Sequence, residues 1–146
     1  MTDTARGAHL VSLCAVIATN VRFEGLTYRG PSGSVIDARV VGRFVPCVST
    51  ALALEYQEVL TNRSGESRRT TVLLALQALL DRAEWIPILQ RLRPLSIDPD
   101  DDFVIECAHS AGASIVTRNL RDLETAQITL GIAVLTPEDF LARLEN

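Results

Sequence analysis

The sequence contains no lysine, so all 14 of its basic side chains are arginines. With 18 acidic residues the formal net charge is −4, which argues against the broad positive surface that most nucleic-acid binders present. Arginine is nevertheless the better bidentate partner for a phosphate group. Binding of a nucleic acid would therefore depend on a few arginines and on a bound divalent cation.

Cysteine is also scarce. Cys14, Cys47 and Cys107 are odd in number, widely spaced and set in apolar runs. This pattern matches neither a disulfide framework nor the regular spacing of zinc ligands. We therefore predict that the three are small buried hydrophobic side chains in a reducing compartment, the cytoplasm.

Long apolar runs are absent, because no stretch approaches the ~18–20 residues that a membrane span needs. Two interpretations fit the start of the chain. Arg6 precedes an apolar run over residues 8–18, as in a short signal peptide, but His9 and Ser12 interrupt that run. We favour a buried first strand over residues 10–17, with residues 1–9 as a flexible or extended lead-in.

The motifs of several function classes are missing. No strand is followed by a Gly-Lys-Ser phosphate loop or by Gly-x-Gly-x-x-Gly, and no acidic pair follows the first strand as in a receiver domain. His9 lies at the chain start and His109 on an outward helix face, which does not favour a Ser-His-Asp triad. The run that begins at Asp98 imitates a calcium loop, but Phe103 stands where that loop requires glycine.

The 146 residues, 47% of them hydrophobic, fit one globular domain over 1–146. Apolar segments alternate with helical ones, which is typical of a parallel α/β sheet. Strands are expected at 10–17, 44–47, 85–89, 114–116 and 132–135. Helices are expected at 34–41, from a Ser49 cap to about 60, at 70–83, from about 98 to a glycine stop at Gly112, and after a Thr136 cap. The segments 25–33 and 62–69 are expected to be a Gly and Pro-rich connection and an exposed loop.

Polar residues immediately follow the apolar strands. Thr19 and Asn20 follow the first strand, Ser49 follows the second, and 117–119 follow a third. Ligands of open α/β sheets bind outside the carboxyl ends of the strands. We therefore expect these polar residues to lie along one edge of the sheet.

Helical geometry distinguishes Asp101 from its acidic neighbours. At about 100° per residue, Asp101 falls on the margin of the apolar face, whereas Asp102, Glu106 and His109 point away. Negative charge in a first helical turn is also favourable in itself, which is the alternative explanation for the acidic run. That explanation accounts less readily for all four packed aspartates, whose mutual repulsion a bound cation would relieve, and Asp101 is the carboxylate that can face a cleft.

The same reasoning applies to the helix that follows Ser49. Glu55 sits at the edge of its inner face and Glu58 lies well outside that face. Glu55 is therefore the better candidate for a site, although a partly exposed, solvated helical glutamate is the alternative.

Five ordered segments resemble the motifs of PIN domains, and in particular of the VapC-like toxins of toxin–antitoxin systems. The resemblance runs over nearly the whole chain, and the segments are 16–21, 55–60, 98–103, 116–123 and 135–141. It implies an α/β three-layer sandwich with a central, mostly parallel sheet flanked by helices. It also implies carboxylates that bind Mg²⁺ or Mn²⁺, cleavage of RNA, an antitoxin protein as partner, and a homodimer.

Carried over by position, the resemblance assigns roles to the acids and to the residues that surround them. The implied metal ligands are Glu55, Asp98, Asp101 and Asp122. The implied catalytic residues are Glu55, Asp101, Asn119 and Asp122, and the implied substrate-binding residues are Asn20, Thr117 and Arg118.

Two positions depart from the family pattern. The first motif reads Asp-Thr-Asn in the family but Ala18-Thr19-Asn20 here, and Asn119 stands where many relatives carry aspartate. Loss of a carboxylate weakens a site for a hard cation and can abolish turnover. Both an engineered substitution and natural degeneration would produce Ala18. The alternative function is a non-catalytic module that binds RNA or protein through arginines, namely Arg63, Arg68, Arg69, Arg118 and Arg121.

Overall fold

The computed structural model describes residues 14–27, 30–40, 42–88 and 99–145. Five parallel strands form one sheet in the order β3-β2-β1-β4-β5. The chain builds the sheet outward from β1 through β2 to β3 and then crosses over to β4 on the other side of β1, as in other doubly wound α/β folds. The strands are β1 (Cys14–Ile17), β2 (Val45–Val48), β3 (Glu84–Trp85), β4 (Ser114–Val116) and β5 (Val134–Leu135).

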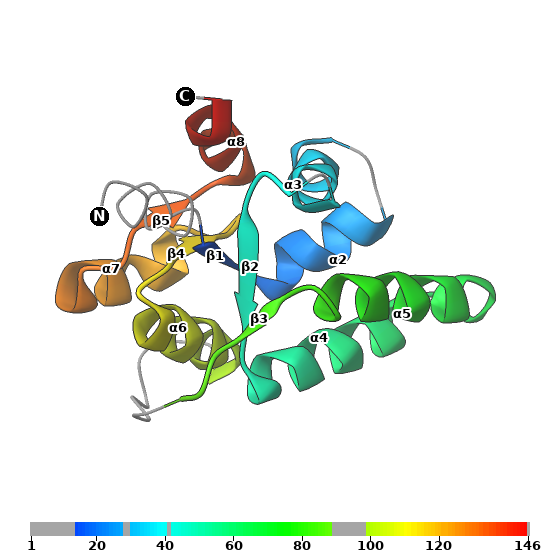
Figure 1. Ribbon diagram of the computed structural model, residues 1–146. Coiled ribbons are helices and arrows are strands. Elements are labelled where there is room, and N and C mark those ends of the chain that lie inside the picture. The colour runs from blue at the N-terminus through cyan, green and yellow to red at the C-terminus, as the bar shows by residue number, and fades with distance from the viewer. Residues whose placement is uncertain (1–13, 28–29, 41, 89–98, 146) are drawn as a thin grey trace.

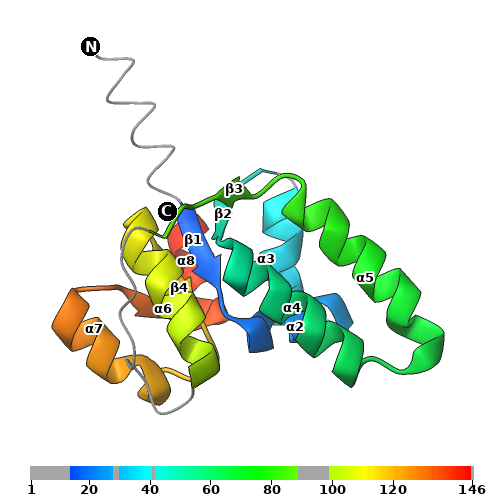
Figure 2. The same cartoon turned by 90° about the horizontal axis from the view of Figure 1, so that it is seen from below.

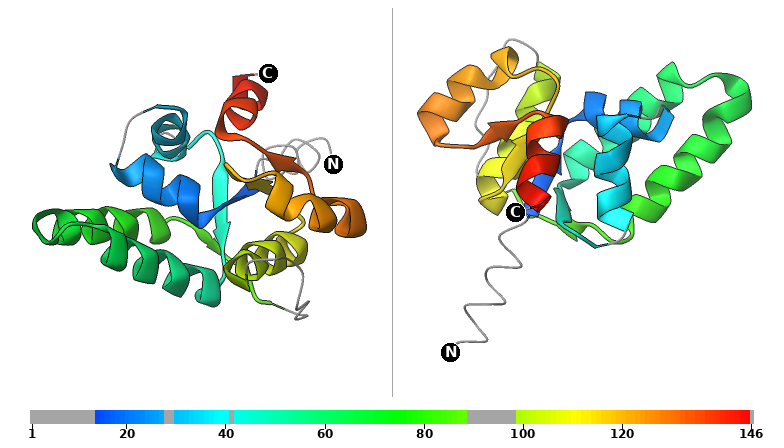
Figure 3. Two further views of the ribbon diagram at one scale, coloured as in Figure 1. Left: turned by 180° about the vertical axis from the view of Figure 1, so that it is seen from behind. Right: turned by 90° about the horizontal axis from the view of Figure 1, so that it is seen from above.

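Helices cover both faces of this sheet (Figure 1). They are α2 (Thr19–Thr27), α3 (Pro31–Val40), α4 (Thr50–Arg63), α5 (Glu66–Leu80), α6 (Pro99–Ala111), η1 (Arg121–Leu123), α7 (Glu124–Leu130) and α8 (Pro137–Glu145). Helices α3 and α8 lie on one side of the sheet, and α4, α5 and α6 lie on the other (Figures 1 and 3). The α4–α5 hairpin projects away from the strands (Figure 2). The predicted α/β sandwich with a parallel central sheet is confirmed.

Alternation along β1 divides the core into two parts. Val16 packs on one face with residues of α4, α5 and α6, whereas Ala15 and Ile17 pack on the opposite face with residues of α2, α3 and α8. Successive side chains of a strand point to opposite faces, so a fully apolar strand is expected where both faces are covered.

The predicted helix caps are confirmed. The Leu52 amide donates to Ser49 Oγ at 3.1 Å, and the Asp139 amide donates to Thr136 Oγ1 at the same distance. Gly112 follows α6 with a φ of 65°, the left-handed conformation that glycine adopts at no steric cost.

Two segments expected to be irregular are helical. The expected connection 25–33 is largely the end of α2 and the start of α3, with Pro31 in the first helical position. Residues expected to form an exposed loop at 62–69 instead end α4 at Arg63 and begin α5 at Glu66. Polar composition suggested loops, but helices that project from the sheet, as α4 and α5 do, carry polar residues over most of their surface.

Asp102 and Glu106 were expected to point away from the buried face of their helix, and for these two residues the expectation is wrong. Only 2% of Asp102 and 4% of Glu106 is exposed, whereas His109 is exposed as expected. Helix α6 contacts β1, β2, β4, α4 and η1, so neighbours cover more of its circumference than its apolar residues indicate.

A buried arginine lies beside the core. Arg22 of α2 is 1% exposed, and its guanidinium carbon stacks 4.7 Å from the centre of the Tyr56 ring. The Tyr56 hydroxyl donates to the carbonyl oxygen of Ile17. Burial raises the pKa of Tyr56 to about 12, although the charge of Arg22 acts in the opposite direction. Within the described part of the chain, Nε and Nη2 of Arg22 have no hydrogen-bond partner.

Candidate functional site

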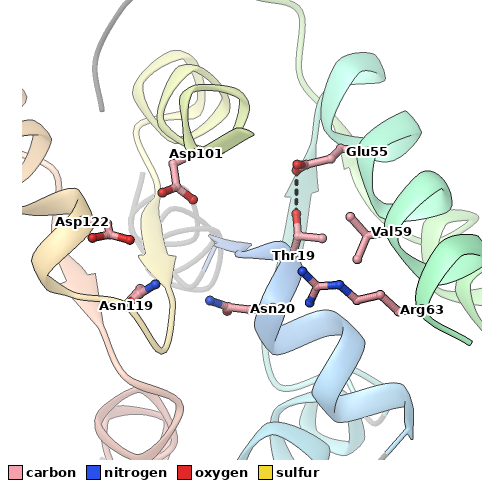
Figure 4. A pocket seen from close by; sticks show the side chains of 8 residues that line it. All are labelled: Thr19, Asn20, Glu55, Val59, Arg63, Asp101, Asn119 and Asp122. Carbon is pink, nitrogen blue, oxygen red and sulfur yellow. Dashed lines mark hydrogen bonds between the residues drawn. The ribbon is translucent and has the colours of Figure 1, made fainter. Parts of the chain in front are cut away.

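A polar pocket of about 270 Å³ opens at the carboxyl ends of the central strands. Residues that follow β1 and β4 line it together with side chains of α4, α6 and η1 (Figure 4). The lining residues are Thr19, Asn20, Glu55, Val59, Arg63, Asp101, Asn119 and Asp122. Segments that are distant in sequence therefore bring three carboxylates and one guanidinium together at the position where α/β sheets bind ligands.

Helix α4 supplies one wall of the pocket. Glu55, Val59 and Arg63 recur at every fourth position, so they share one side of the helix (Figure 4). Glu55 is only 7% exposed, and the Thr19 hydroxyl donates to its Oε2 at 2.7 Å. The hydrogen bond to a neighbouring helix fixes the orientation of this carboxylate. Arg63 stacks 5.7 Å from the centre of the Phe23 ring.

The opposite wall comes from α6 and from the segment after β4. Asp101 and Asp122 are half-buried and line the pocket with Asn119. The backbone N–H of Asn119 donates to Thr117 Oγ1 at 3.0 Å, which closes a tight turn directly after β4. Thr117 is 2% exposed, so it shapes this turn rather than lining the pocket.

Ala18 directly precedes the pocket residues Thr19 and Asn20 but does not itself line the pocket. It is 4% exposed and follows the last residue of β1, and its amide donates to the Val116 carbonyl of β4 at 2.8 Å. Its own carbonyl accepts from the Val21 and Arg22 amides, which begins α2 directly behind the strand. Thr19 and Asn20, which line the pocket, follow it at once. A carboxylate at position 18 would therefore be placed next to the residues that form the pocket.

The donor set of the pocket fits a hard divalent cation. Carboxylate and amide oxygens are the ligands that Mg²⁺ and Mn²⁺ prefer. The side-chain oxygen of Asn20 is buried, and among the described residues it has no hydrogen-bond partner. Glu55, Asp101 and Asp122 are nevertheless spread around the pocket, since their oxygens do not meet within 4.8 Å as a group. Ala18, at the position where the resemblance implies an aspartate, offers no side-chain ligand to this set.

The other residues expected at the site lie beside the pocket. Arg118 pairs with Glu24 at 3.0 Å and Glu138 at 2.8 Å, and so links α2 to α8. The hydrogen bond from Ser32 and, after it, the pairing with Arg118 lower the pKa of Glu24, and Arg118 also lowers the pKa of Glu138. Ser49 caps α4 and is 2% exposed, and Asp98 lies outside the described residues.

Sequence reasoning did not place Arg63 in the pocket. It assigned Arg63 to an exposed loop because the segment that begins at Asn62 is polar. The available signal was the spacing of Glu55, Val59 and Arg63, which follow one another at intervals of four residues. This spacing places them on one side of a helix only if the helix extends about one turn beyond residue 60, as α4 does.

Comparisons with known proteins agree with this architecture. The PIN domain family matches residues 14–121, and no curated protein sequence matches the chain significantly. One similar solved structure is VapBC2 from Rickettsia felis bound to a promoter DNA fragment, with a TM-score of 0.62, 14% identity and coverage of 84% of this chain and 98% of that one.

Two further structures share the fold. FitAcB from Neisseria gonorrhoeae has a TM-score of 0.59 and 14% identity, covering 85% of this chain and 98% of that one. FitAB bound to an IR36 DNA fragment has a TM-score of 0.59 and 15% identity, covering 84% and 94%. At these identities the structures establish the fold, and the family match covers more than half of the sequence. The chain therefore belongs to the PIN domain family.

Proposed function

We propose that this protein is built as a metal-dependent endoribonuclease and that Ala18 lowers its activity. The observation that carries the proposal is the pocket that gathers Glu55, Asp101 and Asp122 at the carboxyl ends of the strands. PIN domains are generally divalent-metal-dependent nucleases, and the pocket holds Glu55, Asp101 and Asp122, three of the four metal ligands that the resemblance implies.

Each polar group in the pocket has a part in this proposal. Glu55, Asp101 and Asp122 would hold a divalent cation, Mg²⁺ or Mn²⁺, with Asn119 and Asn20 as neutral oxygen donors. When bound, such a cation supplies Lewis-acid chemistry at a phosphate and at an attacking water. Thr19 holds the Glu55 carboxylate in place through its 2.7 Å hydrogen bond. Arg63 can bind a phosphate oxygen of RNA, because a guanidinium matches phosphate geometry.

We further propose that the protein is the toxin of a toxin–antitoxin pair. The three similar structures compared above are toxin–antitoxin complexes, which supports an antitoxin protein as its partner. A homodimer and a site of action in the cytoplasm are part of the same proposal. Among the described residues, no helix combines the length and the apolar character needed to cross a bilayer.

The decisive experiment restores the first carboxylate. Ala18→Asp should cleave single-stranded or structured RNA in the presence of Mg²⁺ or Mn²⁺ at a rate at least about a hundredfold above that of the unaltered protein. A cation held by an added carboxylate stabilises the transition state by several kcal/mol, which corresponds to such a factor. Chelation with EDTA should remove the activity.

Two matched substitutions, each added to the Ala18→Asp variant, test whether Glu55 takes part in the cleavage. Glu55→Gln should abolish the restored cleavage, because Glu55 lines the pocket. Glu58→Gln should leave it unchanged, because Glu58 is exposed on the same helix and is not one of the lining residues. If Ala18→Asp folds but cleaves no RNA with either metal, the proposal is wrong.

The presence of Arg63 in the pocket also favours a second candidate, a module that binds RNA without cutting it. This function predicts binding that weakens steeply with salt, falls on Arg63→Gln and is unaffected by metal or by Glu55→Gln. Of the other arginines considered for this function, Arg118 is engaged with two glutamates and Arg69 donates to the Thr61 carbonyl.

A further inference from the structure

A second group of potential metal ligands lies away from the acidic pocket. Cys14 Sγ, Cys47 Sγ and a carboxylate oxygen of Glu84 all lie within 4.8 Å of one another. They come from the neighbouring strands β1, β2 and β3, and among the residues described they form the single such group of three. None of the three residues lines the pocket that holds Glu55 and Asp101.

We propose that these three side chains bind a thiophilic divalent cation, Zn²⁺ in the first instance. Thiolate sulfur selects zinc over magnesium and manganese, and a carboxylate is an accepted third ligand. The site is therefore chemically distinct from the oxygen-lined pocket, and the two should discriminate between soft and hard cations.

The spacing of the ligand atoms fits a shared ion. Tetrahedral geometry with the usual zinc bond lengths puts two sulfurs roughly 3.8 Å apart, and a sulfur and an oxygen roughly 3.6 Å apart. Cys14 Sγ lies 3.8 Å from Glu84 Oε2, and the remaining separations are below 4.8 Å. Small side-chain rotations would bring all three atoms onto one ion.

The sheet register argues against the obvious alternative, a disulfide between the two cysteines. Cys14 pairs with Val45, so Cys47 lies two residues further along the neighbouring strand. For parallel strands this offset separates the two Cα atoms by roughly 8 Å. Disulfides require less than about 7 Å, so the backbone would have to move to form one. Both cysteines are free in the structure.

The three side chains differ in their exposure to solvent, which leaves the site partly accessible. Cys47 is completely buried, Cys14 is half-buried and Glu84 is exposed, so an ion can enter from the edge of the sheet at β3. Binding would release the two thiol protons to the solvent, because zinc binds the thiolate. The ion would then tie three adjacent strands together and stabilise the folded state.

The test is a titration of the full-length, reduced and metal-free protein with Co²⁺ followed by Zn²⁺, in excess Mg²⁺. Co²⁺ should bind one ion per chain with the sulfur-to-metal absorption that only thiolate ligation gives, and Zn²⁺ should displace it. A hundredfold excess of Zn²⁺ over its Kd should raise Tm by roughly 5 °C or more. Absence of the sulfur-to-cobalt absorption would overturn the proposal.

Variants locate the site without relying on the buried position. Glu84 is at the surface, and Glu84→Gln should weaken Zn²⁺ binding by at least about tenfold. Substitution of residues that only support the ligands of a metal site already costs this much affinity. Cys14→Ser should reduce the absorption per bound Co²⁺, whereas Cys107→Ala, a buried cysteine outside the group, should leave it unchanged.

Further measurements test whether this site is independent of the acidic pocket and whether the two cysteines form a disulfide instead of binding metal. Asp101→Asn should retain the full cobalt–sulfur absorption, which separates this site from the proposed nuclease pocket. An absorption that survives unchanged in both Glu84→Gln and Cys14→Ser would contradict the proposal. So would a Cys14–Cys47 disulfide detected by mass spectrometry in place of bound metal.

Discussion

The buried Arg22 gives a direct test of the energetics of this core. Its side chain is 1% exposed, and within the described part of the chain Nε and Nη2 are without partners. Each unpaired buried donor costs about 1–3 kcal/mol, whereas the contact with the Tyr56 ring returns about 2 kcal/mol when desolvated. Arg22→Met removes the two unpaired donors and the ring contact, together with the hydrogen bond between Arg22 and Tyr56, and keeps a flexible apolar chain of similar length. We expect the free energy of unfolding to rise by ~1–3 kcal/mol.

The measurement is urea unfolding followed by circular dichroism. Arg22→Met should raise the midpoint concentration without changing the slope m, because the surface exposed on unfolding is nearly the same. In thermal unfolding the expected gain is about 2–4 °C for each kcal/mol.

The matched control is Arg63→Met, an arginine that also stacks on an aromatic ring but is exposed. It should change the free energy of unfolding by less than about 0.5 kcal/mol, as surface substitutions usually do. If Arg22→Met instead destabilises the protein by more than about 1 kcal/mol, the buried guanidinium is a net stabilising group and the reasoning fails.

Two further predictions concern α2 and its neighbours. Gly25→Ala should destabilise the protein by about 1–3 kcal/mol in urea unfolding, because the added Cβ would lie 2.7 Å from a backbone oxygen of α3. Gly65→Ala, with open space around it, should change stability by less than about 1 kcal/mol. Arg118→Gln should reduce stability near pH 7, because Arg118 lowers the pKa of Glu24 and Glu138. This difference is present above the unfolded glutamate pKa of about 4.3 and should vanish as the pH falls through the lowered values; a difference that persists at pH 2 would contradict it.

Local rules in the sequence singled out two of the acids that line the candidate site. Glu55 and Asp101 stand at the margins of apolar helix faces, and both line the pocket. Asp102, in contrast, was expected to point away from the buried face but is only 2% exposed. The position of a residue around a helix predicts its burial only when one side of the helix is covered. Several neighbouring elements contact α6, so residues outside its apolar face are buried as well.

The sequence by itself determined the alternation of strands and helices, the caps at Ser49 and Thr136, and the polar positions after β1 and β4. These depend on side-chain period and on hydrogen bonds between near neighbours, which a linear pattern records. Helix α2 could not be predicted, because its glycine and its polar residues interrupt the spacing of apolar residues that indicates a helix.

Only the tertiary structure decided which distant residues meet. The strand order placed β3 beside β2 and β2 beside β1, and so brought Glu84 to Cys14 and Cys47. The length of α4 brought Arg63 to the acids, and the positions of α2 and α8 engaged Arg118 with Glu24 and Glu138. Such proximities follow from strand order and helix packing, which join segments with no local signal for each other.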